Sequence, residues 1–325
     1  MKTDEKMIFV AGATGLTGAS VVKCLTRQYP AARIRATYHT TPPFFSHERI
    51  DYVRADLTHR QDCRNASAGC QYAVLAAATT GGAQVAKAEP ARQMTDNLVM
   101  DAMMLEAMQA EGVKRVIYLS SATVYQPFDG YIREEDLDWN LDPHESYLGV
   151  GWAKRSAEKL CQFWHEKYGM EILIVRCANI YGPYAKFDPH TSNFIPALVR
   201  KAVDRMDPFE VWGDAHVVRD VIYVDDVAHV VSLLLDKRDI PFGIFNLGCG
   251  KVTTVGEVVD IVLHHAAHCP QRVMYTGHLP TTIGFRALNC DKIKQTLDWA
   301  PAHTVGEGIS LTLDWWRSNK ESWQR

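Results

Sequence analysis

A glycine-rich segment follows the first apolar run of the chain. Gly12, Gly15 and Gly18 recur at three-residue steps directly after Met7 to Ala11. In a phosphate loop, the first glycine permits a tight turn, the second lets the backbone approach a pyrophosphate, and the third lets a helix pack close to the strand. The helix N-terminus that follows offers free amides and a partial positive charge. The loop residues expected to bind a dinucleotide are Gly12, Thr14, Gly15, Leu16, Thr17 and Gly18.

The end of the next apolar run, Arg33 to Tyr38, bears on which dinucleotide is bound. An acidic residue there would bond the ribose hydroxyls and repel a 2'-phosphate, but the chain continues with His39 and two threonines. We therefore favour NADP over NAD, with His39 as a contact. The alternative for His39 is an exposed loop residue. Asp56 and Leu57 follow a third short apolar segment and are expected to bind the same cofactor.

Further short motifs follow one another along the rest of the chain. They are Ala76 to Gly82, Asn97, Ser120-Ser121-Ala122-Thr123-Val124-Tyr125, Lys154, Asn179-Ile180-Tyr181-Gly182-Pro183, Ser192 to Leu198, Val211-Trp212-Gly213, and Arg219-Asp220 before Val224 to Ala228. With these motifs and the glycine loop, the chain resembles extended short-chain dehydrogenases/reductases of the NAD-dependent epimerase/dehydratase family, most of all the GDP-fucose synthase branch. The resemblance runs almost from end to end. It implies a nucleoside-diphosphate sugar as substrate.

The resemblance also implies roles for individual residues. Ser121 would bond the reacting sugar oxygen, and Lys154 would hold the nicotinamide ribose. Arg219 would neutralise the sugar diphosphate, because a planar guanidinium makes paired hydrogen bonds to phosphate; Arg286 and Lys201 are further candidates. The other implied contacts are Ala76, Ala77, Ala78, Asn97 and Cys177 for the cofactor, and Thr79, Asn179, Asn193 and Trp212 for the substrate. Taken singly, Lys201, Trp212 and Arg286 are as well explained by surface charge or core packing, and Cys177 by a small buried thiol.

The pattern breaks at the catalytic tyrosine. The family places this tyrosine four residues before the lysine, on the same helix face, where this chain has Val150. Valine transfers no proton, and the nearest phenol is Tyr147, one turn upstream. Because Gly149 and Gly151 weaken the helix start, we hypothesise that an irregular turn brings Tyr147 into the missing place.

Two more departures bear on the reaction. GDP-fucose synthases use a cysteine and a histidine at the positions of Thr123 and Asn193 for a double epimerisation, and the dehydratases carry an acidic pair in place of Ala122 and Thr123. We therefore expect neither reaction. What remains is hydride transfer at one sugar carbon of a UDP- or GDP-linked hexose, by a 4-epimerase or a 4-keto reductase. The catalytic candidates are Ser121, Thr123, Tyr147 and Lys154. The alternative, favoured by the missing tyrosine, is a scaffold or sensor that binds a dinucleotide without turnover.

Alternating strands and helices must position these residues. Strands are expected over Met7 to Ala11, Arg33 to Tyr38, Tyr72 to Ala77, Val116 to Ser120 and Ile172 to Arg176, and helices over Val21 to Arg27, Asn97 to Gln109 and Ser156 to Lys167. This alternation predicts an α/β Rossmann fold with a doubly wound parallel sheet. Residues 1–183, with 214–247 returning to them, are assigned to that domain. Prolines interrupt the second half, so 184–213 and 248–325 are assigned to a smaller, mixed, loop-rich substrate lobe.

Composition excludes several classes of protein. A chain of 325 residues that is 47% hydrophobic can bury a large core. Its net charge of −3 with dispersed basic residues gives no footprint for nucleic acid, and no apolar run approaches the ~20 residues of a membrane span. The 8 cysteines form no CxxC pair, which argues against a zinc site or a disulfide framework. We expect a cytoplasmic protein without metal, and the resemblance implies a homodimer paired through the helices at Asn97 to Gln109 and Ser156 to Lys167.

Overall fold

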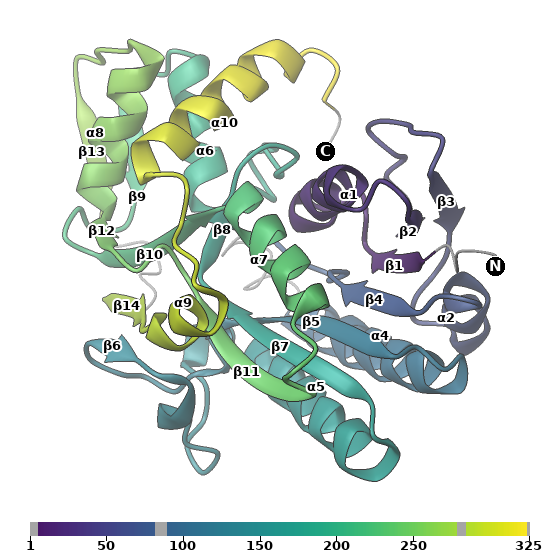
Figure 1. Ribbon diagram of the computed structural model, residues 1–325. Coiled ribbons are helices and arrows are strands. Elements are labelled where there is room, and N and C mark those ends of the chain that lie inside the picture. The colour runs from purple at the N-terminus through teal and green to yellow at the C-terminus, as the bar shows by residue number, and fades with distance from the viewer. Residues whose placement is uncertain (1–5, 82–89, 278–283, 324–325) are drawn as a thin grey trace.

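A seven-stranded parallel sheet, in the order β11-β7-β5-β4-β1-β2-β3, forms the centre of the molecule (Figure 1). The computed structural model describes residues 6–81, 90–277 and 284–323, so Gly82 of the motif after β4 lies outside the described residues. The strands are β1 (Met7–Ala11), β2 (Arg33–Tyr38), β3 (Ile50–Arg54), β4 (Tyr72–Leu75), β5 (Arg115–Ser121), β7 (Glu171–Cys177) and β11 (Phe242–Leu247). The prediction of a doubly wound parallel sheet is confirmed. Strand order reverses at β1, and ligands of such sheets bind at the carboxyl edge beside that point.

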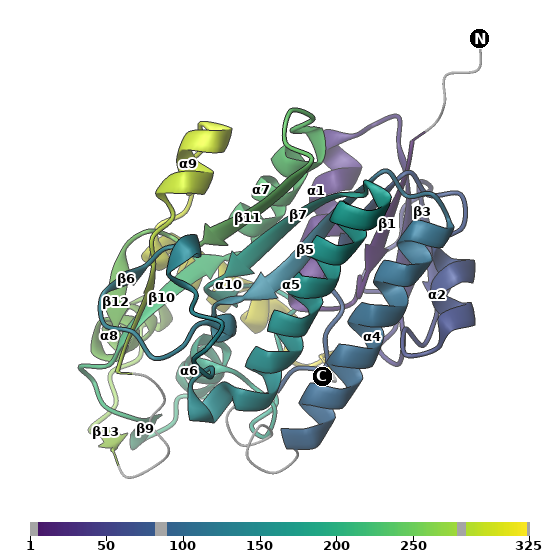
Figure 2. The same cartoon turned by 90° about the horizontal axis from the view of Figure 1, so that it is seen from below.

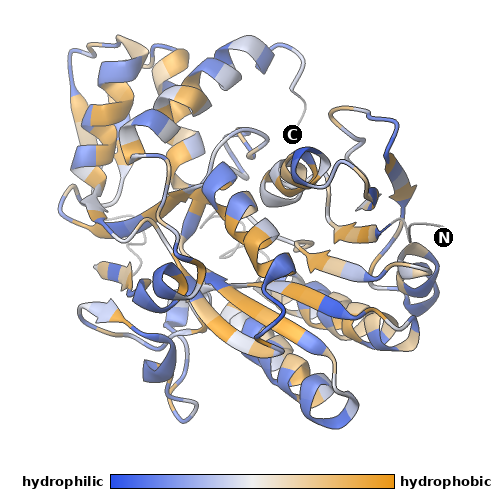
Figure 3. Cartoon of the chain, in the orientation of Figure 1, coloured by the Kyte–Doolittle hydropathy of each residue, from blue (hydrophilic) through white to orange (hydrophobic). Residues whose placement is uncertain are grey.

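Helices cover both faces of this sheet (Figure 2). The helices α1 (Leu16–Gln28) and α7 (Val224–Asp236) pack together on one face, and α2 (Arg60–Ser67), α4 (Pro90–Ala110) and α5 (Leu148–Tyr168) on the other. Successive residues of β1 alternate between the two cores, as the pleat requires: Ile8 and Val10 face α1, and Phe9 faces α4. Hydropathy colouring shows the central strands as the most continuous apolar band (Figure 3).

A second group of elements packs beside the carboxyl edge. A five-stranded sheet contains β6 (Tyr131–Ile132), β8 (Asn179–Tyr181), β10 (Val218–Tyr223), β12 (Val252–Thr254) and β14 (Phe285–Leu288), and β9 (Phe209–Trp212) pairs with β13 (Val273–Thr276). The helices are α6 (Phe194–Val203), α8 (Val255–Ala266), α9 (Asp291–Leu297) and α10 (Val305–Asn319), and short 3-10 turns occur at Ala122–Val124, Glu134–Asp136 and Glu145–Tyr147.

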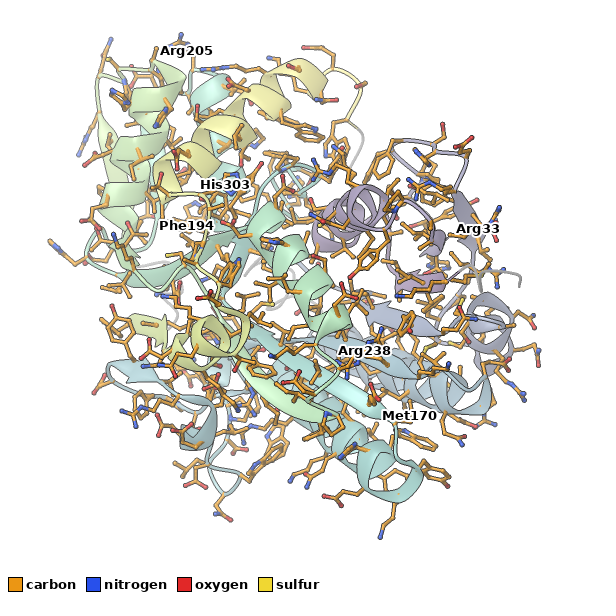
Figure 4. All side chains as sticks on the ribbon, in the orientation of Figure 1. Arg33, Met170, Phe194, Arg205, Arg238 and His303 are labelled. Carbon is orange, nitrogen blue, oxygen red and sulfur yellow. The ribbon has the colours of Figure 1, made fainter. Side chains whose placement is uncertain are left out.

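The second half of the chain contains more helix than its proline-interrupted pattern predicts. Capping boxes start two of these helices, with Thr254 and Glu257 at α8 and Thr304 and Glu307 at α10. His303, labelled in Figure 4, ties the start of α10 to α7 through a 3.1 Å contact between its Nδ1 and Asp226 Oδ1. Within residues 214–247, α7 and β11 pack with the large sheet whereas β10 lies in the five-stranded one; the division into two lobes stays a prediction. Over the described ranges, no helix is long and apolar enough to cross a membrane.

Candidate active site

The predicted site residues surround one cleft of about 1410 Å³. Loops after β1, β2, β3, β4, β5 and β7 reach it from the large sheet, and α6, β9, β10 and β14 from the other elements. Of the residues selected from the sequence, only Gly18 does not line the cleft. Residues far apart in the chain therefore meet where the strand order predicts a ligand.

The glycine loop has the close contacts that its spacing predicts. Gly12 has a φ of +73°, and a Cβ there would lie 2.6 Å from the Cα of Ala77. A Cβ on Gly18 would lie 2.1 Å from the carbonyl oxygen of Gly12, so Gly18 acts through packing of α1 against the loop. The backbone N–H of Gly12 donates to Thr37 Oγ1 at 3.1 Å, which fastens the loop to β2. Gly15, the N-cap of α1, has no side chain to occupy the first-turn amides, so the loop fits a pyrophosphate.

Asp56 and His39 face each other beside β2. Asp56 accepts hydrogen bonds from the Thr58 N–H at 3.0 Å and the Thr58 hydroxyl at 2.6 Å. These bonds hold the pKa of Asp56 below its usual value, so a charged carboxylate lines the cleft. His39 Nε2 lies 3.8 Å from Asp56 Oδ2, and the His39 side chain is 59% exposed.

Asn97 fixes the loop that follows β4. Its amide oxygen accepts from the Thr79 N–H at 2.8 Å, and its amide nitrogen donates to the Thr79 carbonyl at 3.0 Å. The side chain is buried on α4. Asn97 thereby holds the segment Ala76 to Thr79 along the cleft wall.

The serine at the end of β5 is joined to the turn that follows it. Ser121 Oγ accepts from the backbone N–H of Thr123 at 3.2 Å. The Thr123 hydroxyl lines the cleft and is buried with no hydrogen-bond partner among the described residues, so it has a free bond to offer a ligand.

Burial raises the pKa of Cys177 to about 12, which keeps the thiol protonated at neutral pH. That favours the small buried thiol over a reactive cysteine.

Lys154 is held by two residues that sequence reasoning missed. Its Nζ donates to Tyr118 Oη at 2.8 Å and to the Leu119 carbonyl at 3.2 Å, and lies 3.5 Å from Asp101 Oδ2. The Tyr118 hydroxyl donates to Asp101 Oδ2 at 2.6 Å. One signal was present in the sequence: Asp101 follows Asn97 by four residues, so both lie on one face of α4.

The irregular turn that the hypothesis for Tyr147 requires is present, but it ends before Val150. A 3-10 turn, Glu145–Tyr147, does precede α5, but regular α-helix begins at Leu148 and includes Val150. Gly151 does not loosen this helix; its missing Cβ, which would lie 2.6 Å from the Thr123 carbonyl oxygen, permits close packing. Tyr147 lines the cleft with its ring 4.7 Å from the Arg286 guanidinium, and within the described chain it shares no hydrogen bond with Lys154.

Basic side chains gather on the wall formed by β10, β14 and α6. Burial lowers the pKa of both Arg219 and Arg286. Arg200, which sequence reasoning missed, also lines the cleft; its Nε and Arg286 Nη2 are buried without a partner among the described residues. Buried guanidinium nitrogens of this kind suit an anion. Lys201 instead donates to the Glu210 carbonyl at 2.7 Å and lies 5.7 Å from the centre of the Trp212 ring.

Two polar amides complete the lining of this half of the cleft. Asn179 donates through its side-chain amide to the Asp220 carbonyl at 2.9 Å, which joins β8 to β10. Asn193 is the exposed N-cap residue of α6 and makes no side-chain capping bond there. Its amide is therefore not engaged at the helix start.

Comparison with known proteins assigns the chain to a family. The NAD dependent epimerase/dehydratase family matches residues 8–248. GDP-mannose 3,5-epimerase of Arabidopsis thaliana is 28% identical over 324 residues, covering 96% of this chain and 82% of that protein. GDP-L-fucose synthase 1 of the same plant is 27% identical over 335 residues, covering 98% and 95%.

Solved structures agree in fold. UDP-glucose 4-epimerase of Thermotoga maritima superimposes with a TM-score of 0.85 at 22% identity, covering 97% of this chain and 99% of that one. A Bacillus anthracis dTDP-glucose 4,6-dehydratase in complex with NAD gives 0.82 at 22% identity, covering 98% of each. The resemblance to extended short-chain dehydrogenases/reductases is thus confirmed, and the chain belongs to the NAD dependent epimerase/dehydratase family.

Proposed function

We propose that this protein is an NAD(P)-dependent enzyme that transfers hydride at a sugar carbon of a UDP- or GDP-linked hexose, as a 4-epimerase or a 4-keto reductase. The observation that carries the proposal is that one cleft combines a glycine loop, a serine with a lysine, and half-buried arginines. Each group has its own role. The loop binds the pyrophosphate of the cofactor, and the arginines bind the diphosphate of the sugar substrate. The serine contacts the reacting sugar oxygen, and the lysine contacts the nicotinamide ribose.

The cofactor is held by the loop residues Gly12 to Thr17 together with Asp56, Leu57 and the segment after β4. When bound, a nicotinamide dinucleotide supplies a hydride donor or acceptor. NADP is favoured because β2 ends without an acid, and His39 can contact a 2'-phosphate. Separate calorimetric titrations with NAD⁺ and NADP⁺ test the preference; tighter binding of NAD⁺ would reverse it.

The chemistry falls to the side chains that face the sugar. The Ser121 hydroxyl bonds the reacting oxygen and Thr123 offers a second hydroxyl beside it, while Tyr147 is our candidate to take up and return the proton. Support for Tyr147 is its place on the cleft wall, where its ring lies 4.7 Å from the Arg286 guanidinium. Arg219, Arg286 and Lys201 bind the diphosphate, and Trp212 stacks on the nucleotide base or sugar.

Turnover with a panel of UDP- and GDP-sugars tests the reaction. Exchange of configuration at C4 with cofactor retained supports the epimerase, and stoichiometric oxidation of NADPH by a 4-keto sugar supports the reductase. Tyr147→Phe should abolish turnover while cofactor and substrate still bind. Tyr131→Phe is the matched control, because Tyr131 is 47% exposed on β6 outside the cleft. Full turnover by Tyr147→Phe would eliminate its proton-transfer role.

A dinucleotide-binding scaffold or sensor is the second candidate. The observation in its favour is Val150, which occupies a regular helical turn on the cleft wall where the family has its phenol. Cofactor binding without turnover on any nucleotide sugar would support this candidate and contradict the enzyme.

We further propose a homodimer formed through α4 and α5, which lie side by side on one face of the sheet (Figure 2). Phe163 and Tyr168 of α5 are 44% and 55% exposed, although both are large and apolar. Large exposed aromatics on one helix are typical of a protein interface.

A further inference from the structure

Three polar groups with almost no exposure meet beneath the cleft. Asp101 on α4, Tyr118 on β5 and Lys154 on α5 are 1%, 0% and 6% exposed. The ammonium of Lys154 donates to the Tyr118 hydroxyl, which in turn donates to the Asp101 carboxylate. The ammonium also lies 4.6 Å from the centre of the Tyr118 ring. In both hydrogen bonds a donor group faces an acceptor group, so the three side chains form one network.

The network supplies polar partners to a buried ammonium. A buried ammonium is costly unless it is paired and hydrogen-bonded. One turn before Lys154, where a phenol would stand, the chain has only the apolar Val150. The polar partners of the ammonium therefore come from the sheet and from α4 rather than from its own helix.

Other charged groups nearby are already engaged. Glu158, on the same helix, accepts from Arg176 at 2.7 Å and from the Ser120 hydroxyl at 2.6 Å. Asp101 is the one carboxylate within ion-pair distance of Lys154 in the part of the chain that the structure describes. Burial raises the pKa of Asp101, and Lys154 and Tyr118 act against that rise.

We propose that Asp101 is a positioning residue that fixes the Lys154 ammonium at the cleft wall, through Tyr118 and through its own 3.5 Å contact with the ammonium. Lys154 lines the cleft, whereas Asp101 and Tyr118 do not. Asp101 and Tyr118 therefore need not contact a ligand to have this effect. The inference rests on the proposed function, because the role of Lys154 at the nicotinamide ribose is part of that proposal.

The test compares dinucleotide affinity with stability in matched variants. Asp101→Asn should weaken binding of the preferred dinucleotide about tenfold, because a hydrogen bond to a charged group is replaced by a neutral one. Tyr118→Phe, which keeps the ring and removes only the hydroxyl, should weaken binding in the same direction. The control is Asp226→Asn, another buried aspartate that lies outside the cleft; it should leave the dissociation constant unchanged even where it lowers the melting temperature.

A double-mutant cycle separates positioning from a general structural role. In a Lys154→Met background, Asp101→Asn should have no further effect on the dissociation constant, because the group through which Asp101 acts is gone. An equal effect of Asp101→Asn with and without Lys154 would overturn the inference, as would wild-type affinity in folded Tyr118→Phe. Failure of the wild-type protein to bind either dinucleotide would instead refute the proposed function, so the two failures are distinguishable.

Discussion

Gly18→Ala tests whether the close approach of α1 to the glycine loop is what holds the dinucleotide. The added Cβ would lie 2.1 Å from the Gly12 carbonyl oxygen and 2.7 Å from its carbon, both of them backbone atoms without a rotamer to change. Relief of the contact requires the start of α1 to retreat by about 1 Å, and a misplacement of that size costs about a hundredfold at a site that needs close geometry. We expect the dinucleotide dissociation constant to rise by about a hundredfold, or about 2.7 kcal/mol.

Calorimetric titration of the folded variant with NAD⁺ and NADP⁺ measures this loss. Gly306→Ala is the matched control: Gly306 also lies in the first turn of a helix, and its Cβ would meet only His265 Nε2, at 3.5 Å. That variant should keep wild-type affinity and gain about 0.5–1 kcal/mol of stability from helix propensity. If folded Gly18→Ala binds within about twofold of the wild type, the assignment of the loop is wrong.

Three further predictions concern the substrate, pH dependence and assembly. Arg219→Ala should raise KM for the nucleotide sugar about tenfold or more without changing dinucleotide affinity, because charge-assisted bonds to the diphosphate are lost. Burial raises the pKa of Asp220 from 3.8 to about 6, so the folded protein favours the neutral carboxyl. The contribution of Asp220 to folding stability is therefore fully present below pH 3.8 and is lost as the pH rises through about 6. Measured by urea unfolding, the stability of the wild type relative to Asp220→Asn should therefore fall by about 3 kcal/mol between about pH 4 and about pH 7. Phe163→Glu should convert the proposed dimer to a monomer in light scattering, because it would place a charge in the proposed apolar contact between helices.

Each of these predictions has a result that contradicts it. An unchanged KM in Arg219→Ala would remove that arginine from the diphosphate site. A wild-type advantage over Asp220→Asn that stays constant across the same pH range would show that Asp220 titrates alike in the folded and unfolded chain. Leu311→Glu is the control for assembly, since Leu311 is 45% exposed on α10; a wild-type monomer would end the dimer proposal.

The parts of the site that depend on local backbone geometry could be predicted from the sequence. Gly12, Gly15 and Gly18 act within one turn of chain, and the strands β1 and β2 agree with their predicted bounds residue for residue. The end of each short apolar run predicts where a strand ends and a loop begins. In a parallel sheet the residues after each strand lie at the same, carboxyl, edge of the sheet. The placement of Arg219 beside the cleft followed from family resemblance rather than from spacing.

Long-range contacts could not be predicted in this way. Lys154 meets Tyr118 across 36 positions and Asp101 across 53, and no periodicity links them. The apolar periodicity predicts a helix from Ser156, whereas α5 begins at Leu148 and includes Gly149 and Gly151. Gly151 packs against the Thr123 carbonyl oxygen, which would lie 2.6 Å from an added Cβ. Tertiary packing outweighs helix propensity at such a position.

Calorimetric titration of the wild-type protein with NAD⁺ and NADP⁺ tests most directly whether the cleft is a dinucleotide site. We expect saturable binding of one dinucleotide per chain, tighter for NADP⁺ than for NAD⁺. Absence of binding by both dinucleotides at millimolar concentration would contradict the assignment of the cleft.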